Sequence, residues 1–345
     1  MHNYLFPLAI AMTAILSLSG DRPLTAFAAP LSLLPSEDMD VNVKSPLEVW
    51  AAGLDERDYK PAVVNYTNWS CKPSKDGANP IILLHGLMAY PPLQSTAYMA
   101  ERLTQSGYCV YQLLYGVMPS SPDYGGMSDI QDSAKELSAF VEKVLDSAGA
   151  SQVDLIGHSQ GTVVARWYVK FLDKGNKVRS VVSVAPVGRG TTLQGLGSVF
   201  KVFTFFVTLE SLVERYCPAC MQLLKDSDLL KALYADNEEI VPGVRYLNIL
   251  TREDQIVTPY TNGEMKLEDP HDINTVNAEF AAAAKEPSPS QNLIMEDYCL
   301  EAETTAEYSN HFTLFRSPFA VTAAEAFLAG KIGPLGKEDL PCASS

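Results

Sequence analysis

The residues best suited to covalent chemistry are the five in Gly157-His158-Ser159-Gln160-Gly161. A short, mainly apolar run (153–156) precedes them, and residues 162–169 follow with the composition of a helix. The two glycines permit a tight turn that holds the serine hydroxyl clear of a sheet, and the start of the following helix offers free backbone N–H groups beneath it. The pattern therefore indicates a serine nucleophile for acyl transfer.

A serine hydroxyl needs a general base, and two histidines follow Ser159 in the chain. The order strand, serine, helix is typical of α/β-hydrolases, in which an acid and then a histidine follow the serine. His311 lies in a polar loop ahead of a final helical stretch (321–328), whereas His271 lies in a turn crowded with charged residues. We therefore predict His311 as the base, with His271 as the alternative.

The base needs a carboxylate to orient it, and in this order of residues the carboxylate belongs in a loop just after a late strand. Residues 244–250 have the composition of such a strand, and Glu253 and Asp254 follow it directly. We predict Asp254 as the acid, with Glu253 as the alternative.

Backbone N–H groups must stabilise the oxyanion that forms on a substrate carbonyl. One donor is the residue after the nucleophile, Gln160, and the other belongs to the loop after the early His85-Gly86, where we predict Leu87. We expect His85 itself to shape this loop rather than to act as a base.

The elements that must position these groups alternate along the chain. Apolar runs predict strands at 80–87, 108–114, 153–156, 178–185 and 244–250, and longer mixed patterns predict helices at 98–106, 128–148, 162–169 and 321–328. Strands that alternate with helices favour an α/β-hydrolase architecture, a mostly parallel central sheet flanked by helices, in one domain at 61–345. The low-complexity stretch 281–290 is expected to be an exposed connection.

Residues 188–242 interrupt this alternation. The segment has a helical pattern, an apolar stretch at 199–212 and the sequence Cys217-Pro218-Ala219-Cys220. We predict a helical cap inserted above the carboxyl edge of the sheet. The alternative is that the apolar stretch is ordinary core.

The N-terminal residues have the features of a targeting sequence. Residues 4–18 are mostly apolar but too few to span a bilayer comfortably, and Ala26-Phe27-Ala28 offers a small-residue cleavage site. We predict a signal peptide at 1–28, a Pro-rich acidic arm at 29–60 and a secreted, extracellular protein. No other segment is predicted to be a stable transmembrane anchor.

Composition narrows the range of partners and cofactors. The formal net charge of −15 argues against nucleic acid as a partner, because phosphate binding needs a basic surface. Six cysteines suit an oxidising compartment, and Asn65 and Asn68 each begin a glycosylation sequon. No histidine pair has metal-ligand spacing, and Cys217 and Cys220 lack a second pair nearby, so we expect no metal and no organic cofactor.

Several ordered motifs, spread over about 65–330, resemble the secreted class 2 triacylglycerol lipases and, more distantly, yeast lipase B. Besides the serine pentapeptide, the matching motifs are Leu83-Leu84-His85-Gly86, Gly107-Tyr108-Cys109-Val110, Gly190-Thr191-Thr192-Leu193, Cys217-Pro218-Ala219-Cys220 and Thr258-Pro259-Tyr260-Thr261. The sequence departs from the family at Thr162, where a second glycine is usual, and the residues around His311 match it less closely.

The resemblance implies Ser159 as the nucleophile, Asp254 as the triad acid and His311 as the base. It also implies disulfide bonds, which we assign as Cys71–Cys109, Cys217–Cys220 and Cys299–Cys342.

Taken together, these patterns predict a triacylglycerol lipase that forms an acyl-enzyme and meets its lipid or ester substrate at a lipid–water interface as a monomer. A short-chain carboxylesterase, a thioesterase, a peptidase or an acyltransferase could use the same three residues. The other class of hypothesis is a non-catalytic binding protein built on the hydrolase fold, although such proteins usually lack one of the three.

Overall fold

The computed structural model describes residues 65–75, 77–90, 93–191, 213–235, 239–266, 290–299, 309–330 and 335–340. The signal peptide predicted at 1–28, the arm predicted at 29–60 and His271 lie outside the described residues.

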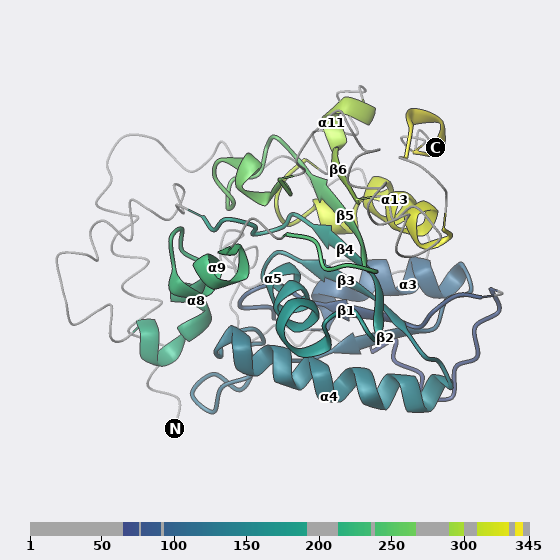
Figure 1. Ribbon diagram of the computed structural model, residues 1–345, viewed down its shortest axis with the longest axis horizontal. Coiled ribbons are helices and arrows are strands. Elements are labelled where there is room, and N and C mark those ends of the chain that lie inside the picture. The colour runs from purple at the N-terminus through teal and green to yellow at the C-terminus, as the bar shows by residue number, and fades with distance from the viewer. Residues whose placement is uncertain are drawn as a thin grey trace, which may run out of the picture.

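A six-stranded sheet forms the centre of the described part of the chain, and all of its neighbouring strands pair in parallel (Figure 1). Its order is β2-β1-β3-β4-β5-β6. The bounds are β1 (Ile81–Leu84), β2 (Val110–Leu113), β3 (Val153–His158), β4 (Val178–Val184), β5 (Arg245–Leu250) and β6 (Ser290–Ile294). The five predicted strands are all present, and the predicted fold class is confirmed.

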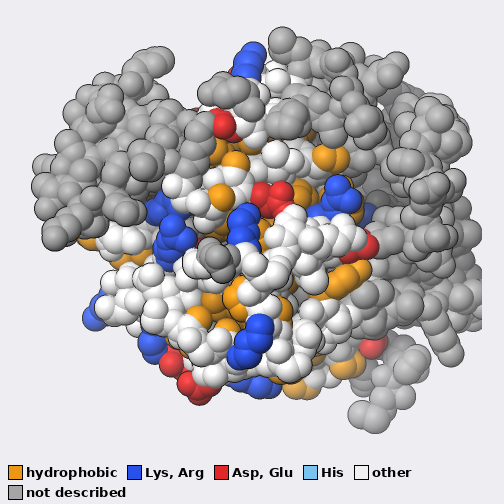
Figure 2. Space-filling model, turned by 90° about the vertical axis from the view of Figure 1, so that its right-hand side faces the viewer, with side chains coloured by type: hydrophobic (Ala, Val, Ile, Leu, Met, Phe, Trp, Pro, Cys, Tyr) orange, Lys and Arg blue, Asp and Glu red, His pale blue; other side chains and the backbone are white. Residues whose placement is uncertain are grey.

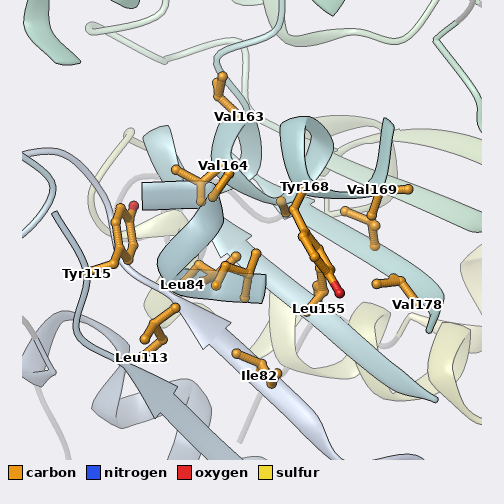
Figure 3. Close-up of a cluster of buried hydrophobic side chains, with 14 of the residues drawn as sticks. Ile82, Leu84, Leu113, Tyr115, Leu155, Val163, Val164, Tyr168, Val169 and Val178 are labelled. Atoms are coloured by element: carbon orange, nitrogen blue, oxygen red, sulfur yellow. The ribbon is translucent and has the colours of Figure 1, made fainter. Parts of the chain in front are cut away.

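Successive residues of β1 face opposite sides of the sheet, and each side carries its own hydrophobic core. Ile82 and Leu84 pack with residues of α4 (Ile130–Ala148) and α5 (Gln160–Trp167), as Figure 3 shows for the α5 side chains Val163 and Val164. Residues of α3 (Ala97–Gln105) and α13 (Pro318–Leu328) pack against the opposite face. Helices on both faces explain why β1 is a continuous apolar run.

The ends of the longest described helix follow from its capping residues. The Asp129 side chain accepts hydrogen bonds from the backbone N–H groups of Gln131 and Asp132, and Gly149 adopts a left-handed conformation after the last turn. Asp129 therefore starts α4 at Ile130, two residues later than the predicted start at 128.

The remaining described helices are short. A π-helical turn η4 (Tyr168–Asp173) continues α5, and the other short helices are α8 (Pro218–Gln222), α9 (Asp228–Leu233), α11 (Met295–Tyr298), η3 (Gln94–Thr96), η6 (Tyr260–Gly263), η7 (Leu314–Arg316) and η8 (Lys337–Asp339). None of the helices in the described ranges combines the length and the hydrophobicity needed to cross a bilayer.

The sixth strand was not predicted. Residue 290 was expected to end an exposed connection, but Ser290 is buried and begins β6, and 281–289 lie outside the described residues. The strand lacks an apolar pattern because its polar side chains bond to neighbouring backbone. Gln291 exchanges two hydrogen bonds with the backbone of Leu335, and Asn292 does the same with Met265.

The described part of the predicted cap is joined to the main core. Ala219 and Leu223 at α8, and Leu229, Leu230 and Leu233 of α9, belong to the same hydrophobic cluster as α4 and α5. The side chain of Gln222 accepts a hydrogen bond from the first N–H of α4 and donates one to Asp129. These helices therefore pack as core, whereas 192–212 lie outside the described residues and their role as a cap stays a prediction.

Two of the assigned disulfide bonds are present. Cys71–Cys109 ties the segment before β1 to the start of β2, and Cys217–Cys220 closes the turn that begins α8. Cys299 is also disulfide-bonded, while Cys342, its predicted partner, lies outside the described residues.

Candidate active site

Ser159 lies at the turn between β3 and α5, with φ +51° and ψ −120°. A β-carbon at Gly157 would lie 2.7 Å from the backbone of Gly161 and Thr162, and one at Gly161 would lie 2.6 Å from the carbonyl oxygen of Leu84. Only glycine fits at either position, so Gly157 is needed for close packing within the turn and Gly161 for close packing against β1. The strained backbone of Ser159 is kept in place by that packing.

Thr162, which departs from the family pattern, closes the same turn. Its backbone N–H and its hydroxyl both donate to the carbonyl oxygen of Ser159, at 3.0 Å and 2.6 Å. The extra hydroxyl therefore adds a hydrogen bond beside the nucleophile.

The structure brings the three residues predicted for catalysis together from distant parts of the chain. His311 Nε2 lies 2.8 Å from Ser159 Oγ, and His311 Nδ1 lies 2.8 Å from Asp254 Oδ2. Ser159, His311 and Asp254 are 6%, 2% and 9% exposed, so water screens these contacts little. A carboxylate can only accept, which means that Nδ1 carries the proton and Nε2 is free to accept the serine proton.

Asp254 is fixed by the loop that carries it. Its Oδ1 accepts from the backbone N–H groups of Ile256 and Val257 at 2.9 Å and 2.8 Å, which leaves Oδ2 for His311. The alternative acid, Glu253, is exposed. The two adjacent carboxylates therefore differ in position, and Asp254 is the one that contacts the imidazole.

The loop that carries His311 is ordered by Asn310, whose side-chain oxygen accepts from the backbone N–H groups of Phe312 and Thr313 at 3.0 Å each. The ring of Phe312 stands edge-on to that of His311, with centroids 5.4 Å apart, and is 46% exposed. Among the described residues that follow β1 and β2, Met88, Leu114 and Val117 are also apolar and exposed.

The peptide between Gly86 and Leu87 is held by His85. The Nδ1 of His85 lies 2.9 Å from the carbonyl oxygen of Gly86 and donates to it. Because the peptide is planar and trans, fixing that carbonyl also fixes the Leu87 N–H, which points the opposite way. The second predicted donor, the Gln160 N–H, belongs to the first residue of α5 and has no acceptor within its own helix.

His85 is itself held on several sides. Its ring stacks on that of Tyr115 with centroids 4.1 Å apart, and the Tyr115 hydroxyl donates to the His85 carbonyl oxygen at 2.5 Å. Burial lowers the pKa of His85 to about 4, so the ring is neutral at ordinary pH. These contacts agree with the expectation that His85 shapes the loop and does not act as a base.

Sequence reasoning missed one residue of this site, His158. It lies inside the nucleophile pentapeptide, is 8% exposed and contacts the backbone of His311. No local pattern could have indicated this contact, since it joins residues 153 positions apart.

Within the described residues, no group of three or more His, Cys, Asp or Glu side chains is placed to hold a metal ion. On the face shown in Figure 2, Lys and Arg side chains are scattered among apolar, acidic and uncharged ones and form no continuous basic patch.

Comparison with known proteins places this site in a family. A 120-residue stretch is 32% identical to a triacylglycerol lipase of Vibrio cholerae and covers 34% of this chain and 35% of that protein, about a third of the relative's length. The crystal structure of Aspergillus fumigatus lipase B superposes with a TM-score of 0.56 at 16% identity, over 82% of this chain and 58% of that chain, and supports the α/β-hydrolase fold.

The sequence profile of the family Lipase (class 2) matches residues 78–284, more than half of the chain. The matched range includes Ser159 and Asp254 and ends before His311, in line with the weaker resemblance around the base. The chain belongs to the class 2 lipase family.

Proposed function

We propose that this protein is a secreted triacylglycerol lipase that hydrolyses carboxylic esters through an acyl-enzyme, with Ser159, His311 and Asp254 as its catalytic triad. The observation that carries the proposal is the imidazole of His311, which lies 2.8 Å from both the serine oxygen and the carboxylate oxygen. This arrangement is the one that makes a serine hydroxyl nucleophilic at neutral pH.

In the first half of the reaction, Ser159 Oγ forms a bond to the ester carbonyl carbon while its proton passes to His311 Nε2. The carbonyl oxygen becomes an oxyanion and accepts hydrogen bonds from the N–H groups of Leu87 and Gln160. Asp254 stabilises the imidazolium through Nδ1. Collapse of the intermediate expels the alkoxide of the substrate, which takes the proton from Nε2, and leaves the acyl group on Ser159.

In the second half, a water molecule loses a proton to His311 Nε2 and attacks the acyl carbon. The same two N–H groups stabilise the second oxyanion. When the bond to Ser159 breaks, the serine oxygen regains the proton and the carboxylic acid leaves.

The residues beside the triad favour lipid esters over small soluble ones. Met88 and Phe312 are 43% and 46% exposed, and they follow the predicted oxyanion donor Leu87 and the base His311 directly. Apolar side chains that remain exposed next to a reactive group are suited to contact acyl chains. A short-chain carboxylesterase with the same triad is the alternative, and it would hydrolyse soluble esters only.

Secretion is the other part of the proposal. The disulfide bonds Cys71–Cys109 and Cys217–Cys220 suit an oxidising compartment, and the apolar N-terminus with its cleavage site suits export. We propose that the exported protein is a monomer. N-terminal sequencing and gel filtration of protein from the culture medium test both points, and a mature chain that begins at residue 1 or elutes as a dimer would contradict them.

Ser159→Ala tests the catalytic proposal. The variant should keep the circular dichroism spectrum and thermal midpoint of the wild type and lose hydrolysis of emulsified triolein and of p-nitrophenyl butyrate by about 10³-fold or more. Wild-type turnover in this variant would exclude the mechanism. If the unmutated protein hydrolyses p-nitrophenyl butyrate but not triolein, the short-chain esterase would instead be favoured.

A further inference from the structure

His158, the last residue of β3, is a buried imidazole that the triad does not use. Its Nε2 lies 2.8 Å from the backbone carbonyl oxygen of His311. We propose that His158 is a positioning residue that fixes the main chain of the catalytic base relative to the nucleophile. This inference rests on the function proposed above, because it gives His158 a role only where His311 is the base.

The direction of the hydrogen bond determines the state of the ring. A carbonyl oxygen can only accept, so Nε2 of His158 carries a proton and donates it. Burial, together with the nearby His311, lowers the pKa of His158 to about 3. The imidazole is therefore neutral wherever His311 can act as a base, and its Nδ1 is unprotonated.

The ring of His158 is closely surrounded. Its centroid lies 5.2 Å from that of His311 and 5.1 Å from that of Phe315. A β-carbon added to Gly86 would lie 3.1 Å from Nδ1 of His158, so a larger residue at position 86 would crowd the ring. His158 thus contacts the loop that carries the base and lies close to Gly86, which precedes the predicted oxyanion donor Leu87.

The hydrogen bond to the His311 carbonyl matters because its donor, His158, is next to the nucleophile in the chain. His158 is bonded directly to Ser159, so the strand that positions the nucleophile also holds the backbone of the base. The hydrogen bonds of Nδ1 and Nε2 orient the His311 imidazole. The hydrogen bond at the His311 carbonyl sets the distance of its loop from β3. A displacement of about 1 Å between reacting groups can cost about 100-fold in rate, so the loss of this restraint should be visible in kcat.

Two variants of the full chain separate the hydrogen bond from the packing. His158→Gln keeps an N–H donor at a similar reach and loses the ring, whereas His158→Phe keeps a ring against Phe315 and loses the donor. The assay is hydrolysis of p-nitrophenyl butyrate, with the concentration of active sites titrated by a fluorophosphonate. Dividing by titrated sites removes any effect of a lower folded fraction.

We expect His158→Phe to lower kcat per titrated site about tenfold or more with KM changed less than twofold. His158→Gln should stay within about threefold of the wild type. The fall of kcat/KM towards low pH, the acid limb of its pH profile, should persist in both variants, since His311 remains the base. A phenylalanine variant with wild-type kcat per site, a glutamine variant as slow as the phenylalanine variant, or loss of the acid limb would overturn the proposal.

A measurement on the wild type does not depend on the folding of any variant. In ¹⁵N-resolved NMR spectra, His158 should show a proton on Nε2, none on Nδ1, and no titration between about pH 5 and 9. A proton on Nδ1 would overturn the proposal, because that tautomer cannot donate to His311. If the proposed function itself is wrong, the wild type will neither react with the fluorophosphonate nor hydrolyse the ester. That result differs from every outcome named for the His158 variants.

Discussion

Replacing Asp154 with asparagine should change how the stability of this protein depends on pH. Asp154 lies near the amino end of β3, at the opposite end of the strand from Ser159, and is 1% exposed. In the register of the sheet it is a neighbour of Ser180, which in turn is a neighbour of Arg245. A buried carboxylate of this kind is costly to ionise.

The magnitude follows from the pKa of this carboxyl group. Burial raises it from an ordinary value of 3.8 to about 6, and the neighbouring Ser180 and the charges of Arg179 and Arg245 offset the burial only in part. A raised pKa means that the folded state holds the proton more tightly than the unfolded state. Between about pH 4 and pH 6 the free energy of unfolding should therefore fall as the pH rises. The shift of about two pH units corresponds to about 3 kcal/mol.

Urea denaturation at pH values from 4 to 8 measures this contribution. The difference in unfolding free energy between Asp154→Asn and the wild type should shift in favour of the variant by about 2–3 kcal/mol across that range and be constant above about pH 7. Asp228→Asn, a substitution at an exposed aspartate, is the control and should show no such change. A difference that is flat with pH, or that shifts against the asparagine variant as pH rises, would refute the reasoning.

Two further predictions concern the predicted catalytic groups. Asp254→Ala should lower kcat about 10³–10⁴-fold, because the His311 imidazole loses the group that fixes its tautomer, whereas Glu253→Ala should leave kcat within about twofold; comparable losses in both variants would contradict the assignment. His85→Leu, which cannot donate to Gly86, should lower kcat by about 10- to 100-fold with little change in KM, since loss of a whole oxyanion donor costs about 10²–10³. His85→Asn, which keeps a donor near the position of Nδ1, should recover most of that loss, and no difference between the two His85 variants would show that the hydrogen bond to Gly86 does not matter.

The parts of the fold that sequence could predict are those encoded over short distances. Strand β1 is apolar throughout and β4 is rich in valine because both faces of the sheet are covered, so their composition alone indicates them. The turn at Ser159 was likewise predictable, since the glycines at 157 and 161 are required by close contacts within the turn and with β1.

The parts that sequence could not predict depend on contacts between distant residues. Strand β6 is stabilised by the hydrogen bonds of Gln291 and Asn292 to backbone far along the chain, and neither contact leaves an apolar pattern. The order of residues in α/β-hydrolases suggested Asp254 and His311, but only the fold shows that Glu253 is exposed and that His158 reaches the His311 carbonyl. Chain order can suggest which residues react, whereas the residues that position them emerge only from packing.

The most direct test of the proposed mechanism is to trap the covalent intermediate. Wild-type protein mixed with p-nitrophenyl butyrate and quenched in acid within the burst phase should carry a butyryl group on the peptide that contains Ser159, and mass spectrometry of the digest locates it. The same treatment of Ser159→Ala should give no modified peptide. Steady hydrolysis with the acyl group on another residue, or with no burst and an active Ser159→Ala variant, would contradict the account.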